Sequence, residues 1–261
     1  MTRRTGHPSA AGSQPAPRCP CCADRVLPDD ARHPDEPWAV RRAGLLDVNR
    51  IARMIGEHRP FIDLDGDGEP DEVPHPEHAG TATRLMLSLG GLEHGELWFA
   101  EQDDAVTAVA FWLPPDAEHL AQDLHRVISR ELDVVPVRDP EPAHAPLRSI
   151  VTATSQTLAL MQTADAERVL VLLSDDGTAT GERRRALLAD VLAPVVAEQA
   201  VAGRPVLAVT VDPAQVADLT ALGFAELDRT PLGAASLWLG VLRGDAPRRA
   251  AQAAQAAIAT T

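Results

Sequence analysis

The segment 172–188, LLSDDGTATGERRRALL, combines residue types that suit anion binding at a strand-to-helix turn. An apolar run ends in Asp175 and Asp176, a loop of Gly and Thr follows, and Glu182 with three arginines begins a helical pattern. Backbone N–H groups in the first turn of a helix point toward a bound anion and lie at the positive end of the helix dipole. This segment is therefore the first candidate for holding a phosphate group.

The charged residues of this segment have opposite effects on the binding of a phosphate. Glu182 adds a negative charge beside the expected phosphate, and two like charges about 4 Å apart repel by roughly 4 kcal/mol at an effective dielectric constant near 20. Arg183, Arg184 and Arg185 offset this charge if their guanidinium groups reach the phosphate. Alternatively, the arginines lie on the solvent face of the helix, and the sequence favours neither arrangement.

The stretch 63–73, DLDGDGEPDEV, is the second candidate site because it looks like a calcium-binding loop. Carboxylates stand at loop positions 1, 3, 5 and 9 and a glycine at position 6: Asp63, Asp65, Asp67, Asp71 and Gly68. Position 12, which carries a bidentate Glu in such loops, is Pro74. We therefore expect a solvated connector and assign no metal ligand. Calcium binding and an acidic rim for a cationic molecule are the alternatives.

The three cysteines, Cys19, Cys21 and Cys22, fall in one short segment and cannot cross-link distant parts of a fold. A zinc site would need a fourth ligand such as His7 or His33, and the spacing matches no zinc-finger or ribbon pattern. A reduced, solvated thiol cluster is therefore favoured. Surface positions are expected for these histidines: His75, His78, His94, His119 and His125.

Composition excludes some classes of partner. The 261 residues contain 24 basic and 38 acidic side chains, giving a net charge of −14, which argues against a nucleic acid or an anionic membrane as the main partner. No uncharged apolar stretch is long enough to span a membrane, and no apolar segment of a secretory signal follows the first arginines. We therefore expect a soluble, cytoplasmic protein. Its core should be aliphatic, because the chain has four Phe, four Trp and no Tyr.

Apolar periodicity predicts one mixed α/β domain at 38–243, between a disordered leader at 1–37 and a low-complexity tail at 244–261. Helical spacing places Leu45 and Ile51 on one face of the first helix. The predicted strands are 38–43, 96–102, 105–115, 168–173, 204–211, 224–230 and 235–243. The predicted helices are 44–58, 77–95, 114–132, 147–164, 181–202 and 212–223.

Four segments together resemble the GCN5-related N-acetyltransferases, the GNAT superfamily, and look closest to its branch common in actinobacteria and fungi. These segments are 96–116, 169–194, 205–224 and 226–243. The first resembles a central hairpin that ends in Trp-Leu-Pro-Pro, and the second takes the place of the acetyl-CoA strand, loop and helix. The third closes on the Gly223-Phe224 pair, and the last looks like the closing hairpin with its Leu-Trp pair.

The resemblance implies the mixed-sheet α/β fold of acyl-CoA N-acyltransferases. It also implies transfer of an acetyl group from the cosubstrate acetyl-CoA to a small-molecule or peptide amine. In that fold two parallel strands, here 168–173 and 205–211, part to pair with the pantetheine arm, and the pyrophosphate rests on the following loop and helix. The residues expected to contact acetyl-CoA are Leu172, Leu173, Thr180, Gly181, Arg183, Arg184, Arg185 and Gln215.

The pyrophosphate loop is degenerate when compared with the family pattern. The three family glycines fall on Thr180, Glu182 and Arg184, although Gly181 serves as the first if the loop is one residue shorter. Side chains at these positions keep the backbone from approaching a phosphate closely. An alternative function is therefore a catalytically silent protein of the same fold, which serves in binding or regulation with weak or no CoA binding.

Proton transfer also departs from the family pattern. The position of the family's Tyr general acid is Leu219, so water, Ser174 or Asp212 would have to protonate the leaving thiolate. Asp175 and Asp176 are candidates for the general base, but termination of the strand and capping of the loop is the favoured interpretation. We therefore leave the catalytic residues unassigned. The oligomeric state is also left open.

Overall fold

The computed structural model describes residues 37–58, 63, 76–114, 159–161 and 163–244. The cysteine cluster and the predicted helix at 114–132 lie outside the described residues, as does the aspartate-rich loop apart from Asp63. Of the helix predicted at 147–164, residues 159–161 and 163 are described and helical.

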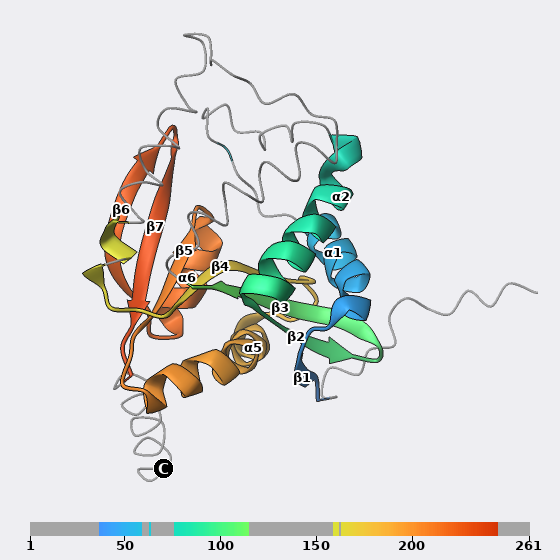
Figure 1. Ribbon diagram of the computed structural model, residues 1–261, viewed down its shortest axis with the longest axis horizontal. Helices are drawn as coiled ribbons and strands as arrows, with labels where there is room; N and C mark the ends of the chain where they lie inside the picture. The colour runs from blue at the N-terminus through green and yellow to red at the C-terminus, as the bar shows by residue number, and fades with distance from the viewer. Residues whose placement is uncertain (1–36, 59–62, 64–75, 115–158, 162, 245–261) are drawn as a thin grey trace, which may run out of the picture. The chain divides into compact units, whose positions relative to one another are not determined.

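The described residues form one seven-stranded mixed sheet in the order β1-β2-β3-β4-β5-β7-β6. Its strands are β1 (Ala39–Arg42), β2 (Glu96–Gln102), β3 (Ala105–Leu113), β4 (Arg168–Asp175), β5 (Val206–Thr210), β6 (Ala225–Leu232) and β7 (Ala235–Leu242). Neighbours in this sheet pair antiparallel, except β4 and β5, which are parallel. The predicted mixed sheet is confirmed, and Figure 1 shows β6 and β7 on the side opposite β1.

Helices cover both faces of the sheet. They are a 3₁₀ turn at Leu45–Asp47, α1 (Val48–Glu57), α2 (Pro76–Leu85), a π-helical stretch η3 (Met86–His94), α5 (Gly181–Val201) and α6 (Pro213–Ala221). One buried cluster joins α5 and α6 to the sheet, and another joins α1 and η3 to the opposite face. We call these the α5 face and the α1 face (Figure 1).

The start of the first helix differs from the sequence prediction. Leu45 was expected on the buried face, but it is 72% exposed and Leu46 is 91% exposed. The buried residue of this turn is Asp47, whose carboxylate accepts hydrogen bonds from Arg41 and from the backbone N–H of Gly44. A polar anchor therefore takes the inward position, and the apolar face of α1 begins after it.

Arg41 joins the start of the first helix to the sheet. Its guanidinium bonds Asp47 at 2.7 Å and Glu101 of β2 at 2.9 Å, and it lies over the Phe99 ring. The hydrogen bonds from Arg41 lower the pKa values of both the Asp47 and Glu101 carboxyl groups, although burial opposes the shift. The network fixes the orientation of α1, whose far end reaches the site described below.

One extra residue in β4 separates it from β5. Phe111 pairs with Leu172 and Trp112 pairs with Leu170, so Val171 has no partner on β3 and forms a β-bulge. A bulge bends the strand that carries it and increases its local twist. Pairing between β4 and β5 ends at Leu170 and Ala208, directly beside the bulge. The predicted parting of these strands is therefore confirmed, and we call the gap between residues 171–175 and β5 the strand opening.

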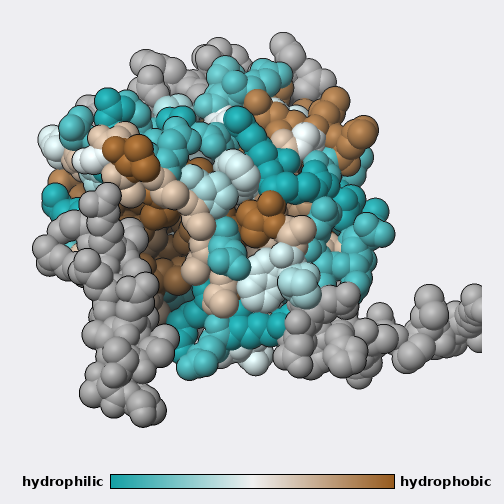
Figure 2. All heavy atoms as spheres, turned by 90° about the horizontal axis from the view of Figure 1, so that it is seen from below, coloured by the Kyte–Doolittle hydropathy of each residue, from teal (hydrophilic) through white to brown (hydrophobic). Residues whose placement is uncertain are grey.

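Outside the core, most of the face drawn in Figure 2 is hydrophilic, and hydrophobic residues form separate patches on it. The large hydrophobic side chains that are exposed among the described residues are Leu45, Leu46, Val201 and Leu227.

Two glycines are expected to respond oppositely to the same change. A Cβ added to Gly240 of β7 would collide with the ring of Trp238, which is buried in the core, whereas a Cβ added to Gly56 of α1 meets nothing within 4 Å. We expect Gly240→Ala to lower the free energy of unfolding by about 1–3 kcal/mol. Gly56→Ala should raise it by roughly 0.4–1 kcal/mol. Urea unfolding checks both, and equal effects would contradict the packing around Trp238.

Candidate functional site

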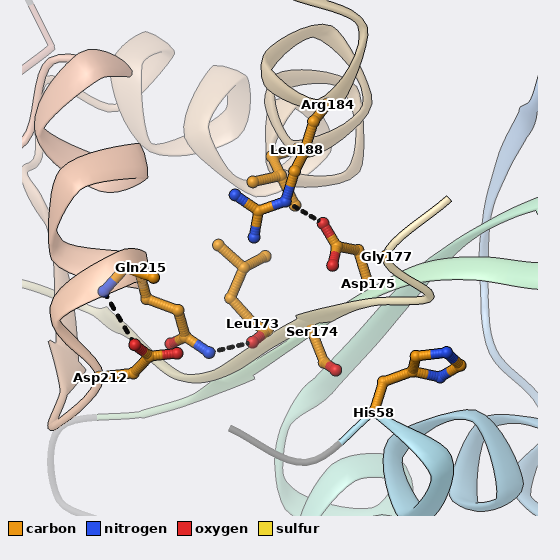
Figure 3. Close-up of a pocket in the computed structure, with 10 residues that line it drawn as sticks. His58, Leu173, Ser174, Asp175, Gly177, Arg184, Leu188, Asp212 and Gln215 are labelled. Atoms are coloured by element: carbon orange, nitrogen blue, oxygen red, sulfur yellow. Dashed lines mark hydrogen bonds and ion pairs between the residues drawn. The ribbon is translucent and has the colours of Figure 1, made fainter. Parts of the chain in front are cut away.

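A pocket of about 390 Å³ lies at the strand opening. Strand β4, the loop after it, the first turns of α5 and α6, and the end of α1 all contribute to its wall. Its polar lining includes Ser174, Asp175, Arg184, Gln215 and His58, shown in Figure 3. The pocket is therefore lined by residues from five segments at the point where β4 and β5 separate.

Side chains reach this pocket from both faces of the sheet. Asp175 bonds Arg184 of α5 and so lies on the α5 face. The Ser174 hydroxyl donates to the sulfur of Met54 of α1 at 3.9 Å and so lies on the α1 face. Successive residues of a strand point to opposite faces, as these two do. A molecule in the strand opening can therefore be contacted from either side of the sheet.

The backbone of Leu173 faces the strand opening. Gln215 Nε2 donates to the Leu173 carbonyl oxygen at 2.7 Å (Figure 3). Gln215 Oε1 accepts from the Thr210 hydroxyl at 2.9 Å. The N–H and C=O groups of one strand residue point to the same neighbouring strand, so the Leu173 N–H also faces the opening. The side chain of Leu172 packs instead against the hydrophobic cluster of the α1 face.

Arg184 is held between two carboxylates. Its guanidinium bonds Asp175 of β4 and Asp218 of α6. The Arg184 side chain is 28% exposed, that of Asp175 is 11% exposed and that of Asp218 is 17% exposed. Burial alone would lower the pKa of Arg184, but the hydrogen bond to Asp218 and the charge of Asp175 outweigh it and raise the pKa. Arg184 thus remains charged and ties the first turn of α5 to β4 and α6.

The neighbouring arginines have different surroundings. Arg183 lies over the ring of Trp38, with its guanidinium carbon 5.0 Å from the ring centroid. Arg185 and Glu182 are exposed, and neither lines the pocket. The three consecutive arginines therefore have different positions: Arg183 lies over an aromatic ring, Arg184 lines the pocket and Arg185 lies on the surface.

The loop between β4 and α5 bonds to itself. The buried Asp176 carboxylate accepts from the N–H of Thr178 at 3.0 Å and from its hydroxyl at 2.6 Å. Thr180 precedes the helix without a side-chain capping bond, and Gly181 has a left-handed φ of 56°. The predicted capping role therefore fits Asp176, and the Thr178 N–H, one possible anion donor, already has a partner.

The side chains that the sequence offers as proton donors both lie at the pocket. Ser174 and Asp212 both line the pocket, and Asp212 also caps α6 by accepting from the Ala214 N–H at 2.8 Å. Leu219, at the position of the family's Tyr, is 1% exposed and packs in the core of the α5 face.

Sequence reasoning missed His58, which follows the last residue of α1 and lines the pocket. Its ring Nδ1 lies 3.2 Å from the carbonyl oxygen of Met54. No second histidine or acid at a characteristic spacing marks it in the sequence. The signal lies only in the fold, which brings the end of α1 to the strand opening.

No helix of the described residues is long and apolar enough to cross a membrane. In the same residues, no group of three or more His, Cys, Asp or Glu side chains is placed to hold a metal ion.

Arg184 and Arg185 form a matched pair for testing the role of the two carboxylates. Replacing Arg184 with Ala leaves the mostly buried carboxylates of Asp175 and Asp218 without this partner, and we expect a loss of about 1–3 kcal/mol in unfolding free energy. Replacing the exposed Arg185 should change it by about 0.5 kcal/mol or less. Urea unfolding of both variants checks this, and equal losses would show that the ion pairs contribute nothing to stability.

No protein-family model and no curated protein matches the chain. Among solved structures, an agmatine N-acetyltransferase mutant matches 80% of this chain and 100% of its own, with 14% identity and a TM-score of 0.52. A polyamine N-acetyltransferase of Drosophila melanogaster matches 79% of this chain and 100% of its own, with 14% identity and a TM-score of 0.51. The C-terminal condensation domain of Ebony, in complex with β-alanyl-dopamine, matches 79% and 99%, with 8% identity and a TM-score of 0.51. The chain has the GNAT acyl-CoA N-acyltransferase fold.

Proposed function

We propose that this chain is an N-acetyltransferase that moves an acetyl group from acetyl-CoA to an amine. The observation that carries the proposal is the strand opening, where β4 leaves β5 after Leu170 and the backbone of Leu173 faces a pocket. Backbone groups without a strand partner can pair with an extended amide chain in the same way as a neighbouring strand would. The pantetheine arm of acetyl-CoA is such a chain. We assign the activity to residues 38–243, with 1–37 and 244–261 as flanking segments.

The residues present fit the arm of acetyl-CoA better than its diphosphate. We assign Leu173 to the arm through its backbone, and Leu172 as its neighbour in β4, with Gln215 beside them because it already bonds the Leu173 carbonyl. Since Asp176 occupies the Thr178 N–H, the diphosphate would rest on the first turn of α5, at Thr180 and Gly181. Guanidinium groups follow in this turn, and we assign them to the same anion: Arg183, Arg184 and Arg185.

The thioester supplies an activated acetyl group, and the chain supplies orientation and proton transfer. The Leu173 N–H faces the opening and is placed to donate to a carbonyl oxygen bound there. Ser174 lines the pocket and carries a hydroxyl proton, so we assign Ser174, or a water beside it, as the donor to the leaving thiolate. Asp212 is less suited, because its carboxylate already accepts the Ala214 N–H and caps α6.

We propose a small-molecule amine as the acceptor, and a peptide amine as the alternative. The solved structures named above include enzymes for agmatine and a polyamine, both cationic amines. The pocket of this chain is lined by the carboxylates of Asp175 and Asp212 and by the cation Arg184, and Asp218 lies behind them. This excess of negative charge, in a chain of net charge −14, favours a cationic molecule over an acidic one. We further propose that the protein is cytoplasmic and that neither a nucleic acid nor a membrane is its partner.

A catalytically silent protein of the same fold is the second candidate. Two observations favour it. Arg184 is already bonded to Asp175 and Asp218, and Asp176 already occupies the Thr178 N–H. An incoming diphosphate would have to compete with these internal carboxylates.

Titration calorimetry with acetyl-CoA separates the two candidates. We expect micromolar affinity for the full chain, because the backbone of Leu173 faces the pocket and its N–H can pair with the pantetheine arm. Ala214 lines the pocket at the start of α6, and Ala217 lies on the same helix, exposed and outside the pocket. Ala214→Trp should fill the pocket and weaken binding at least tenfold, while Ala217→Trp should leave the affinity unchanged.

Two results would overturn the proposal. Absence of heat at millimolar acetyl-CoA would favour the silent protein. Unchanged affinity in both tryptophan variants would show that acetyl-CoA binds outside this pocket. Circular dichroism of both variants checks that α6 remains folded.

A further inference from the structure

We propose that His58 is the general base that takes the proton from the amine, and that the amine approaches from the α1 face. This inference rests on the proposed acetyltransferase function and names a residue of the same site.

The ring of His58 lies on the α1 side of the pocket. A Cβ built on Gly177 would be 3.9 Å from His58 Cδ2, so the ring reaches the loop that follows β4. In Figure 3 the Ser174 hydroxyl points toward the side of His58, whereas Arg184 lies on the other side of β4. The imidazole and the proposed proton donor are thus on one face, and the proposed diphosphate site is on the opposite face.

The contact with Met54 fixes the tautomer of His58. A carbonyl oxygen can only accept a hydrogen bond, so Nδ1, at 3.2 Å from Met54 O, carries the hydrogen and donates it. The neutral ring then has its lone pair on Nε2, for which the described residues provide no hydrogen-bond partner. A base that is oriented through one nitrogen and open at the other is the arrangement that proton abstraction requires.

The carboxylates near the pocket are engaged in other interactions. Asp175 bonds Arg184 on the α5 face, and Asp176 is buried and bonds Thr178. Asp212 caps the first turn of α6. Among the described residues that line the pocket, His58 is therefore the side chain best placed to accept a proton.

The proton balance of the step is simple. Nε2 of His58 accepts one proton from the amine nitrogen as that nitrogen forms its bond to the acetyl carbon. The bond between that carbon and sulfur breaks, and the thiolate takes a proton from Ser174 or from water. His58 then returns its proton to solvent, because the residue is exposed at the end of α1. The net reaction converts an amine and a thioester into an amide and a thiol.

Charged groups around the pocket must be counted in any pH dependence of this step. Asp175 of β4 and Asp212 before α6 are negative, and Arg184 of α5 is positive. On α1 itself, the exposed Arg53 and Glu57 are near neighbours of His58 in the sequence. A change in pH profile is therefore assigned to His58 only by comparison with a matched variant.

His58→Gln and His94→Gln provide that comparison. Gln keeps an N–H donor for Met54 but cannot act as a base near neutral pH. His94 is 52% exposed, lies at the end of η3, and is outside the pocket. The assay follows CoA thiol release between pH 5.5 and 9 with agmatine, spermidine and phenethylamine as probe amines. Titration calorimetry measures acetyl-CoA affinity in parallel.

We expect His58→Gln to lower kcat/KM at pH 7 by about 100-fold, the usual lower range for loss of a general base, and to remove the acidic limb between pH 5.5 and 8. Acetyl-CoA affinity should stay within about twofold of wild type, and His94→Gln should match wild type throughout. An acidic limb that survives in His58→Gln would overturn this inference alone. A wild-type chain that binds acetyl-CoA but acetylates none of the three amines would contradict both proposals, and one that binds no acetyl-CoA would contradict the function at its first step.

Discussion

The insertion of Val171 into β4 is the constraint on which the site depends. Strand β4 stays paired to β3 along nearly its whole length, so the extra residue cannot be absorbed by a shift of the strand end. The bulge instead turns the distal half of β4 away from β5, and pairing ends at Leu170. An interior strand thereby gains an unpaired edge, which is costly unless its polar groups find other partners. The Gln215 amide supplies such a partner to the Leu173 carbonyl.

The same opening explains why the charged residues gather where they do. Asp175 lies beyond the end of the β4–β5 pairing, where β4 is still paired to β3, and its side chain bonds Arg184 of α5. Arg184 also bonds Asp218 of α6. The bridge fixes the first turn of α5 over the pocket. It also means that the cation nearest the opening is already neutralised by two anions, so an anionic ligand must exchange partners with them and gains less than it would from a free arginine.

Much of the fold follows from apolar periodicity, because helices and strands that bury one face must repeat at characteristic intervals. The hairpin at Asp103 and Asp104, strand β4 and helices α5 and α6 are all confirmed. The bulge could not be predicted, because RVLVLL is apolar throughout and a skipped residue leaves no break in the pattern. Leu45 was placed wrongly because periodicity cannot reveal that Asp47, an acid, is the anchored and buried residue.

The site was harder to predict than the fold. The arginine run gave no indication that its middle member would turn inward to Asp175 and Asp218, since that depends on two distant carboxylates. His58 has no partner at a recognisable spacing and gains its position only when α1 docks against the sheet. The assignment of Leu173 came from the family resemblance and stays a prediction, whereas the positions of the side chains around it depend on tertiary packing.

A pocket lined from both faces of a sheet has a consequence for the order of events in a two-substrate reaction. If acetyl-CoA occupies the α5 side and the amine the α1 side, each product leaves by its own exit and neither has to wait for the other. Under the proposed function, direct transfer within one ternary complex would need no covalent intermediate on the protein. The departure of CoA from the edge of β4 would then be the step most sensitive to how strongly Gln215 bonds the Leu173 carbonyl.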